Sequence, residues 1–408
     1  MKVFTVILAV CLSVLVLSSS VSAGGPNYKR ICYYTNWGQY RPKLGKFLPE
    51  DIDPTLCTHI IYAFGMLKHN KLKAFEWNDE TKPWRVGMFD RVIALKKKNP
   101  ALKVLLAVGG WTAGTKEMGK MLASAANRTA FTKQAISFLR TRKFDGLDLD
   151  FEFPGSRGSR RNDKFRFTLL CKGLKNAFIQ EAAKRKLDRL LLTAAVSAAP
   201  KTIRRAYQVR NIARYLDFIN LMAYDFHGAW DNRTGHNAPL FRRKKERGYK
   251  AQLNLSYAAR FWKWFGCPPS KLIIGLGVYA RGFRLKYADY YYGMNSQTVG
   301  ASDAALYTQE KGFVAYYEIC RMLYGKRKKK KKLARYWNKE QKVPYLVYGD
   351  QWYGYDDETS LAWKVYWLKK GGYGGWMVWS LDMDDFRGKF CNKGRYPLIT
   401  AMNRMLLS

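Results

Sequence analysis

The chain has 408 residues, of which 48% are hydrophobic and 15% aromatic, so it can bury one large core or two smaller ones. It carries 72 Lys and Arg residues against 31 Asp and Glu residues, a formal net charge of +41 that favours an anionic partner or matrix. The sequence has no nucleic-acid-binding signature, only four histidines and no Cys-x-x-Cys pair. We therefore expect no nucleic acid, no metal site and no cofactor.

The first residues predict export. After Met1 and Lys2 the chain is apolar from position 3 to 17, and small residues follow up to Ala23. A charged start, a short apolar core and a small-residue cleavage site are typical of a secretory signal peptide, here residues 1–23. No other stretch approaches the roughly 20 apolar residues that a membrane span needs. We expect a soluble, secreted, extracellular protein with no membrane partner.

Six cysteines remain beyond that signal peptide, and an exported protein favours disulfides over metal ligation. Six cysteines allow many pairings, so this count alone does not fix the bridges. The six are Cys32, Cys57, Cys171, Cys267, Cys320 and Cys391.

Short apolar runs rich in β-branched residues alternate with longer segments of helical pattern. One such segment, residues 127–143, places Phe131, Ala135 and Leu139 at helical spacing. Strands that are apolar throughout and alternate with helices are typical of buried parallel sheets, and a closed (β/α)₈ TIM barrel is the simplest arrangement. The predicted strands are residues 31–35, 58–64, 104–108, 146–151, 190–196, 218–223, 272–278 and 374–379.

The connection after the seventh predicted strand is too long for one helix. Residues 284–348 hold many aromatic side chains and short strand-like pieces such as 343–347. They predict a small α+β insertion domain between strand 7 and helix 7, which leaves residues 24–283 and 349–408 for the catalytic barrel. We expect no linker or carbohydrate-binding module after the barrel.

The fourth predicted strand carries a row of acids. Asp148, Asp150 and Glu152 recur at every second residue, so on a strand they share one face while Leu147 and Leu149 point to the other. Neighbouring carboxylates raise one another's pKa values, which keeps one of them protonated near neutral pH as a general acid. The alternative is a half-exposed strand with a solvated acidic face, which is out of character in so basic a chain.

In a barrel of this type the chemistry lies at the C-terminal ends of the strands. Glu152 lies at the end of the fourth strand, Tyr224 follows the sixth and Trp379 ends the eighth. Trp111 follows Gly109 and Gly110 after the third. A single aromatic residue is more often part of the core than a ligand contact. Here acidic and aromatic residues occur together at the ends of several strands, which predicts a site at one rim of the barrel.

At this point the chain resembles a glycoside hydrolase family 18 chitinase of the animal chitotriosidase and acidic chitinase type. The acidic motif fits the family pattern Asp-x-x-Asp-x-Asp-x-Glu at all four acidic positions, from Asp145 to Glu152. The other motifs that carry the resemblance are residues 32–37, 58–64, 76–81, 109–111, 222–228, 279–281 and 377–382.

The resemblance implies a monomeric, endo-acting enzyme that hydrolyses chitin or chito-oligosaccharides with retention of configuration. In this family the substrate's own acetamide group assists the reaction. Glu152 would protonate the glycosidic oxygen, and Asp150 would orient the acetamide. Asp148 would share a proton with Asp150, and Tyr224 would donate a hydrogen bond to the acetamide carbonyl. Asp145 would have a structural role at the start of the strand.

The resemblance also implies a binding cleft and two disulfides. Trp379 would form the floor under the reacting sugar, because an indole face packs well against pyranose C–H groups. Cys32–Cys57 and Cys320–Cys391 match the family's bridges, which leaves Cys171 and Cys267 without an assigned partner. The other implied cleft residues are Tyr33, Trp37, Phe64, Glu76, Trp77, Gly109, Gly110, Trp111, Thr112, Phe153, Met222, Ala223, Asp225, Trp230, Tyr279, Arg281 and Met377.

Two departures from the family pattern bear on activity. The family's Trp-Glu-Tyr is here Phe151-Glu152-Phe153, so the hydroxyl at position 153 is missing. The usual Asn after Gly-Gly-Trp is Thr112. We expect reduced or altered activity rather than none, because Glu152 is retained. The alternative is a weakly active or inactive chitin-binding lectin or extracellular matrix protein.

Basic residues gather in three clusters, at residues 157–166, 242–250 and 326–332. Chitin is neutral, so this charge does not help to bind it. The clusters are either scattered solvated lysines and arginines or an anchor to an acidic extracellular matrix or sulfated polysaccharide.

Overall fold

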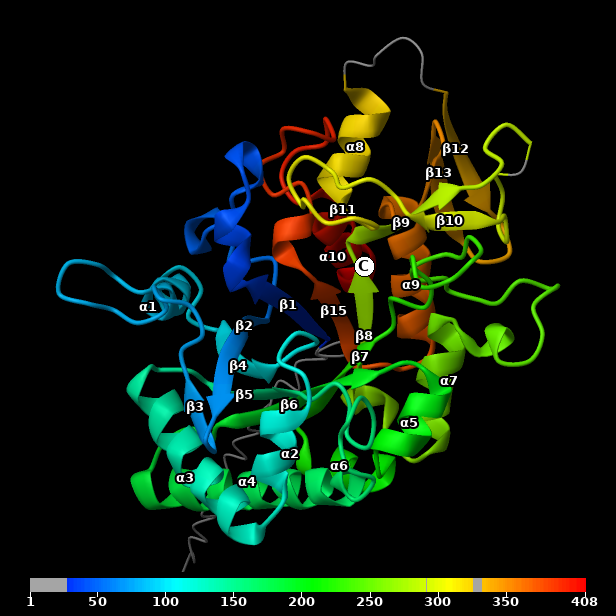
Figure 1. Ribbon diagram of the computed structural model, residues 1–408. Helices are drawn as coiled ribbons and strands as arrows, with labels where there is room; N and C mark the ends of the chain where they lie inside the picture. The colour runs from blue at the N-terminus through cyan, green and yellow to red at the C-terminus, as the bar shows by residue number, and fades with distance from the viewer. Residues whose placement is uncertain (1–27, 291, 326–331) are drawn as a thin grey trace, which may run out of the picture.

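The computed structural model describes residues 28–290, 292–325 and 332–408. The predicted signal peptide and the basic run 326–332, apart from Lys332, lie outside these residues. Eight parallel strands close into a barrel, because β1 pairs in parallel with both β2 and β15 (Figure 1). The predicted (β/α)₈ barrel is confirmed. Its strands are β1 (Lys29–Thr35), β2 (His59–Lys68), β4 (Lys103–Gly109), β5 (Gly146–Asp150), β6 (Leu191–Ser197), β7 (Phe218–Met222), β8 (Leu272–Gly277) and β15 (Gly375–Trp379).

Helices cover the outside of this barrel. Within α3, which spans the predicted helical segment, Phe131, Ala135 and Leu139 are buried, as the spacing requires. No helix of the described residues is long and apolar enough to span a bilayer. The outer helices are α1 (Met88–Ile93), α2 (Lys116–Leu122), α3 (Ala125–Thr141), α4 (Asp163–Arg185), α5 (Pro200–Ala206), α6 (Val209–Tyr215), α7 (Leu255–Trp264), α9 (Glu358–Lys370) and α10 (Pro397–Leu407).

A six-stranded antiparallel sheet follows β8 and lies beside the barrel with α8 (Figure 1). Only Val278 separates β8 from β9, so the sheet begins before the predicted range 284–348 and also ends after it. Phe283, Leu285, Val347 and Trp352 form its own small core. Its elements are β9 (Tyr279–Leu285), β10 (Thr298–Ala301), β11 (Phe313–Ala315), α8 (Tyr316–Tyr324), β12 (Leu333–Asn338), β13 (Val343–Tyr348) and β14 (Gln351–Gly354).

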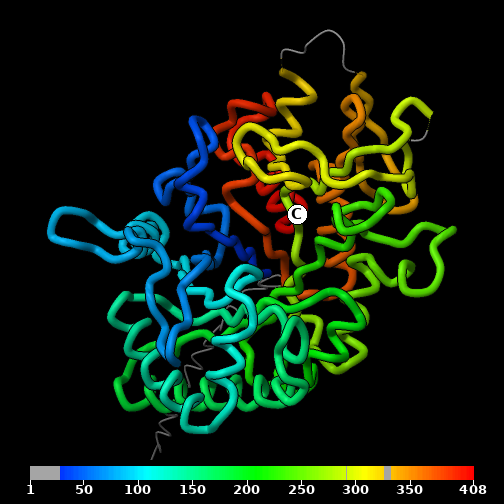
Figure 2. The backbone as a smooth tube through the Cα atoms, viewed as in Figure 1, coloured from blue at the N-terminus to red at the C-terminus, as the bar shows by residue number. Residues whose placement is uncertain are grey.

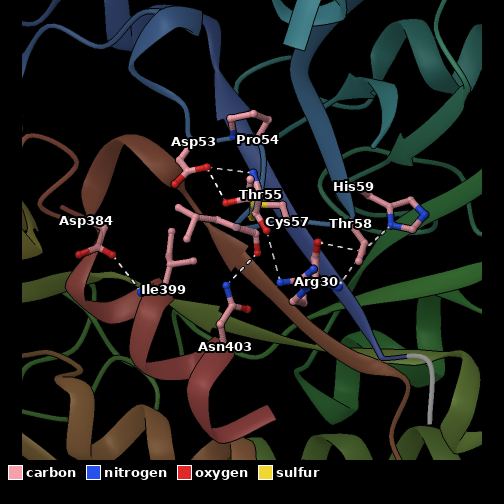
Figure 3. Close-up of a disulfide and its surroundings, with 12 residues drawn as sticks. Arg30, Asp53, Pro54, Thr55, Cys57, Thr58, His59, Asp384, Ile399 and Asn403 are labelled. Atoms are coloured by element: carbon pink, nitrogen blue, oxygen red, sulfur yellow. Dashed lines mark hydrogen bonds between the residues drawn. A yellow bond between two sulfur atoms is a disulfide. The ribbon is translucent and has the colours of Figure 1, made fainter. Parts of the chain in front are cut away.

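Two disulfides fasten the chain. Cys32–Cys57 joins β1 to the segment before β2, where Thr58 Oγ1 accepts a hydrogen bond from the Arg30 amide at 2.9 Å (Figure 3). Nearby, Asn403 of α10 donates to the carbonyl of Leu56 at 2.9 Å. Cys320–Cys391 joins α8 to the segment before α10. Both implied bridges are confirmed, and Cys171 and Cys267 are buried free thiols.

Asp145 fixes the start of the strand that carries the acids. Its carboxylate accepts two hydrogen bonds from Lys96 Nζ, each at 2.8 Å, and one from the Val104 amide at 2.7 Å. Asp145 therefore ties the beginning of β5 to β4 and to the helical segment that contains Lys96, far from the C-terminal ends of the strands.

Candidate active site

β5 separates its side chains onto two faces, as the alternation predicts. Leu147, Leu149 and Phe151 are buried on the outer face, where the Phe151 ring lies 6.4 Å from the Phe167 ring of α4. Asp148 and Asp150 are also buried, but on the inner face. A solvated acidic face is therefore excluded for these two carboxyl groups.

Asp148 is held by side chains from three other strands. Tyr33 Oη donates to Oδ2 at 2.7 Å, while Thr193 Oγ1 and Asn220 Nδ2 donate to Oδ1 at 2.6 and 3.3 Å. Burial raises the pKa of Asp148 to about 6, and these hydrogen bonds lower it in part by stabilising the anion. Asp148 is thus fixed in position at the centre of the barrel.

Asp150 has a different environment. Its Oδ1 is buried and accepts no hydrogen bond from the described residues, and no hydrogen bond joins it to Asp148. Burial raises the pKa of Asp150 well above its ordinary value, and the charges of Glu152 and Asp148 raise it further. The Asp150 carboxyl group therefore favours the protonated form and leaves one oxygen without a partner.

Glu152 follows β5 and is partly exposed. Burial raises its pKa to about 7, while the charge of Arg157 lowers this value and the charge of Asp225 raises it. A carboxyl group with this pKa can release and regain a proton near neutral pH, as a general acid and base must.

Tyr224 and Asp225 follow β7. Tyr224 Oη donates weakly to Met377 Sδ at 3.8 Å, and burial, followed by the charge of Asp150, raises the pKa of its phenol well above the ordinary value. Tyr224 therefore remains a hydrogen-bond donor. Asp225 accepts a forked pair from Arg281, at 2.8 and 2.9 Å, and a third bond from Tyr279 Oη at 2.7 Å.

An aromatic cluster surrounds Trp379 at the end of β15. The ring of Tyr33 lies 5.3 Å from the Trp379 ring, that of Trp37 6.0 Å and that of Phe64 6.1 Å. Since Tyr33 also donates to Asp148, the indole cluster and the row of acids share one residue. These distances bring together the predicted floor and the predicted catalytic acids.

Gly110 lies against this cluster. A Cβ atom there would meet the Phe64 ring at 2.7 Å, and its φ of +86° disfavours side chains, so the close approach requires glycine. Gly109, at φ +116°, is equally restricted by the Asp150 carbonyl, 2.0 Å from a Cβ.

Trp111 and Glu152 are linked through Arg157. The Arg157 guanidinium lies 3.5 Å from the centre of the Trp111 ring, and its Nη1 donates to the carbonyls of Trp111 and Glu152, both at 3.1 Å. Trp111 nevertheless remains 59% exposed.

Among the described residues, no hydrogen bond joins the remaining implied cleft residues to Asp148, Asp150 or the Glu152 side chain. Trp77 Nε1 donates to Tyr40 Oη, which donates to Glu76, and Arg85 covers the Trp77 ring at 4.4 Å. Glu76, Trp77 and Arg85 belong to the segment between β3 (Lys71–Lys73) and α1. This segment projects from the barrel (Figure 2). Trp230 lies 5.3 Å from the Arg281 guanidinium. The other four are exposed Thr112, partly buried Phe153 and Met222, and buried Ala223.

Sequence reasoning missed Thr193, Asn220, Tyr40 and the individual role of Arg157. Thr193 and Asn220 were within the predicted apolar strands, and a polar residue in a buried strand is itself a signal, because it needs a partner. Arg157 was included only as part of a basic cluster.

The fold and the site define a TIM-barrel protein with carboxyl groups and aromatic rings at the ends of its strands. The sequence profile of glycosyl hydrolases family 18 matches residues 29–384. The chain belongs to this family.

Relatives include members of more than one kind. The chain is 46% identical to chitotriosidase-1 of Mus musculus, over 94% of this chain and 79% of that protein. It is 42% identical to the oviduct-specific glycoprotein of Papio anubis, over 94% of this chain but only 59% of that protein's length.

Solved structures show the same breadth. The immunomodulatory active chitinase TsES1 of Trichuris suis matches with a TM-score of 0.87 and 42% identity, over 93% of this chain and all of that one. Human YKL-39, described as a pseudo-chitinase with retained chitooligosaccharide binding, matches with a TM-score of 0.86 and 40% identity, over 93% and 100%. Family membership alone therefore does not decide whether this chain is active.

Proposed function

We propose that the protein is a secreted, endo-acting chitinase that cleaves β-1,4-linked N-acetylglucosamine polymers by a retaining, substrate-assisted mechanism. The observation that carries this proposal is the row Asp148, Asp150 and Glu152, in which the last carboxyl group has a pKa of about 7. Such a group is protonated often enough to act as an acid and ionised often enough to act as a base.

In the first step, Glu152 gives its proton to the glycosidic oxygen. The acetamide carbonyl oxygen of the sugar attacks its own anomeric carbon as the bond to the leaving sugar breaks, which produces an oxazolinium ion. Asp150 accepts a hydrogen bond from the acetamide N–H and stabilises the positive charge that develops there. Tyr224 donates to the acetamide oxygen and orients it.

In the second step, the ionised Glu152 takes a proton from water. The water oxygen bonds to the anomeric carbon, the oxazolinium ring opens to restore the acetamide, and Glu152 regains its proton. Two inversions at the same carbon give net retention. Asp148, fixed by its three donors, shares one proton with Asp150: it takes this proton in the first step, which leaves Asp150 ionised beside the acetamide, and returns it when the oxazolinium ring opens.

The test is release of a fluorophore from a chitotriose glycoside. The unaltered protein is expected to turn over, and Glu152→Gln, which keeps the shape but cannot donate a proton, is expected to lose at least about a hundredfold in rate. Equal background rates for the two proteins would reject catalysis.

The second candidate is a chitin-binding protein that barely hydrolyses. Phe153 and Thr112 favour it, because both replace polar groups that the family pattern has near the substrate. Binding of chitotetraose by the unaltered protein, together with equal background rates in the assay above, would select this function.

We also propose that the basic surface retains the protein in an acidic extracellular matrix by binding sulfated polysaccharide. The net charge of +41 supports this. Retention on a heparin resin should be strong at low salt and weak at high salt, and retention independent of salt would reject it.

A further inference from the structure

A pocket of about 500 Å³ lies among the outer helices of the barrel, and none of Asp148, Asp150, Glu152, Tyr224 and Trp379 lines it. It is lined by residues of the α4 N-terminal turn, the junction of α5 and α6, and the segment after α7. The proposed catalytic mechanism does not use this pocket, and of its lining residues only Lys164 belongs to one of the three basic clusters.

The lining is strongly positive. Among the described residues that line the pocket are the cations Lys164, Arg204 and Arg210, and none is an acid. None of these three cations forms an ion pair with a carboxylate of the described residues; Lys164 Nζ donates only to the Arg204 carbonyl, at 2.8 Å. Three unneutralised charges around one concave surface attract an anion more strongly than the same charges dispersed.

Aromatic side chains border the same pocket. Phe265 lines it, and its ring lies 4.7 Å from that of Phe261 and 5.6 Å from that of Trp264. Trp264 does not line the pocket itself, but it lies beside Phe265, its ring is 6.0 Å from that of the buried Phe261, and it is 74% exposed. The guanidinium of Arg204 lies 5.2 Å from the Phe261 ring, so one of the three cations contacts the aromatic cluster directly.

The pocket also contains an unused acceptor. Gln208, between α5 and α6, lines it, and its Oε1 is buried without a hydrogen-bond partner. A buried polar atom of this kind normally has a partner. Because this oxygen is itself shielded from solvent, a ligand hydroxyl reaches it only when the Gln208 side chain turns toward the pocket.

We infer that this pocket binds a sulfated glycan, with Lys164, Arg204 and Arg210 contacting sulfate groups, Trp264 and Phe265 packing on sugar rings, and Gln208 accepting from a hydroxyl. Sulfates require cations, pyranose C–H faces pack on aromatic rings, and hydroxyls require acceptors. This surface presents the first two, and Gln208 supplies the third when its side chain turns toward the pocket. The inference refines the retention in the matrix proposed above and depends on it, and it is independent of chitin hydrolysis.

The test measures binding of a heparin-derived octasaccharide by calorimetry at fixed salt. The triple variant Lys164→Gln/Arg204→Gln/Arg210→Gln is expected to raise Kd by at least about tenfold. The matched control Lys68→Gln/Lys71→Gln/Lys73→Gln removes the same charge from exposed residues of β2 and β3, and should change Kd by less than about threefold. All variants are expected to turn over the chitotriose glycoside normally.

The aromatic contribution is tested separately. Trp264→Ala should weaken binding several-fold without a change in charge, whereas Trp363→Ala, which removes an exposed indole from α9, should not. A desulfated octasaccharide should bind poorly.

Several results would overturn the inference. Equal losses in the two triple variants would mean that the charge acts diffusely over the surface. No effect of Trp264→Ala, or tighter binding of an eight-nucleotide single-stranded DNA, would exclude a glycan site. If the unaltered protein does not bind the octasaccharide at all, the proposed retention fails as well, whereas normal turnover would leave the chitinase proposal intact.

Discussion

At Glu152, opposite charges act on the same carboxyl group. Burial raises its pKa, Arg157 opposes that rise and Asp225 adds to it. Asp225 is itself bound to Arg281 and Tyr279, so its position is fixed. The acid–base properties of Glu152 therefore depend on residues from three different segments of the chain rather than on the acidic motif alone.

Replacing Arg157 should move the pH profile in a defined direction. Arg157 lowers the pKa of Glu152, so Arg157→Gln raises it. The proposed first step needs protonated Glu152, and the alkaline limb of kcat/KM should therefore shift to higher pH. Arg157→Lys, which keeps the charge, should preserve the limb even though it loses the forked contacts with Trp111. An alkaline limb that moves to lower pH in Arg157→Gln would contradict this account.

Position 153 offers a gain-of-function test. Phe153 is partly buried and directly follows Glu152, and it lacks the hydroxyl that the family pattern provides. Phe153→Tyr should raise kcat/KM on the chitotriose glycoside about two- to tenfold, the value of one added hydrogen bond. The control is Phe151→Tyr, the same change on the outer face of β5, which should lower stability without raising activity. A faster Phe151→Tyr and an unchanged Phe153→Tyr would refute the assignment of the two faces.

At the scale of elements, aspartates at the starts of strands hold the barrel in register. Asp145 does so for β5, and Asp217 before β7 does so for β6. Asp217 accepts hydrogen bonds from Arg189 and Lys175 and from the Leu192 amide, the last at 2.8 Å. Both residues lie far along the strands from the candidate site, so their contribution is to stability.

Asp217→Asn should therefore lower the free energy of unfolding by about 1–3 kcal/mol at neutral pH. Burial alone would raise the pKa of Asp217, but the hydrogen bonds from Arg189 and Lys175 hold it below its ordinary value. Because the pKa of Asp217 is lower in the folded state than in the unfolded state, ionised Asp217 stabilises the fold fully at pH values above its unfolded-state pKa of about 3.9. This stabilisation is lost as the pH falls through the folded-state pKa. Urea unfolding should show the difference between the variant and the unaltered protein shrinking below about pH 4.

The control for that experiment is Asp188→Asn. The Asp188 side chain is 96% exposed and lies 3.8 Å from Lys103, so its replacement should change stability by only a few tenths of a kcal/mol at any pH. A difference for Asp217→Asn that grows as the pH falls would contradict the argument.

The elements show which parts of this fold can be predicted from sequence. Each of the eight strands was predicted within a few residues, because buried parallel strands are apolar throughout and helices separate them. The insertion domain was predicted to begin at residue 284, whereas the second sheet begins at Tyr279, since β9 continues almost directly from β8. No change in composition marks that passage from one sheet to the other.

The site was predictable to the extent that local spacing determines it. The alternation in β5 placed Asp148 and Asp150 correctly on the inner face. Two partners of Asp148, Thr193 and Asn220, come from strands distant in sequence, and only closure of the barrel brings them to it. The same holds for Arg157, whose contact with Trp111 depends on how two loops meet.

At the scale of the whole molecule, the net charge of +41 should influence which substrates approach the cleft. Fully acetylated chito-oligosaccharides are neutral and are neither attracted nor repelled by the mean field. Oligosaccharides that carry protonated glucosamine units are repelled, and salt reduces this repulsion, since the Debye length falls from about 30 Å at 0.01 M to about 10 Å at 0.1 M.

The two substrates should consequently respond differently to ionic strength. One substrate is an oligosaccharide with a single glucosamine outside the reacting unit, assayed at mildly acidic pH where the amine is charged. Its kcat/KM should rise about two- to tenfold as the salt concentration increases from 0.01 to 0.1 M. The fully acetylated oligosaccharide of the same length should show a nearly flat response and serves as the control for salt effects on the enzyme itself. The measurement is the change with ionic strength in the ratio of the two rate constants, because the intrinsic cost of losing one acetyl group is the same at every salt concentration and drops out of that change. A ratio that stays constant with ionic strength would show that the cations lie too far from the cleft, or are too well screened, to act on the substrate. The cations would then act only at surfaces such as the pocket beside α5 and α6.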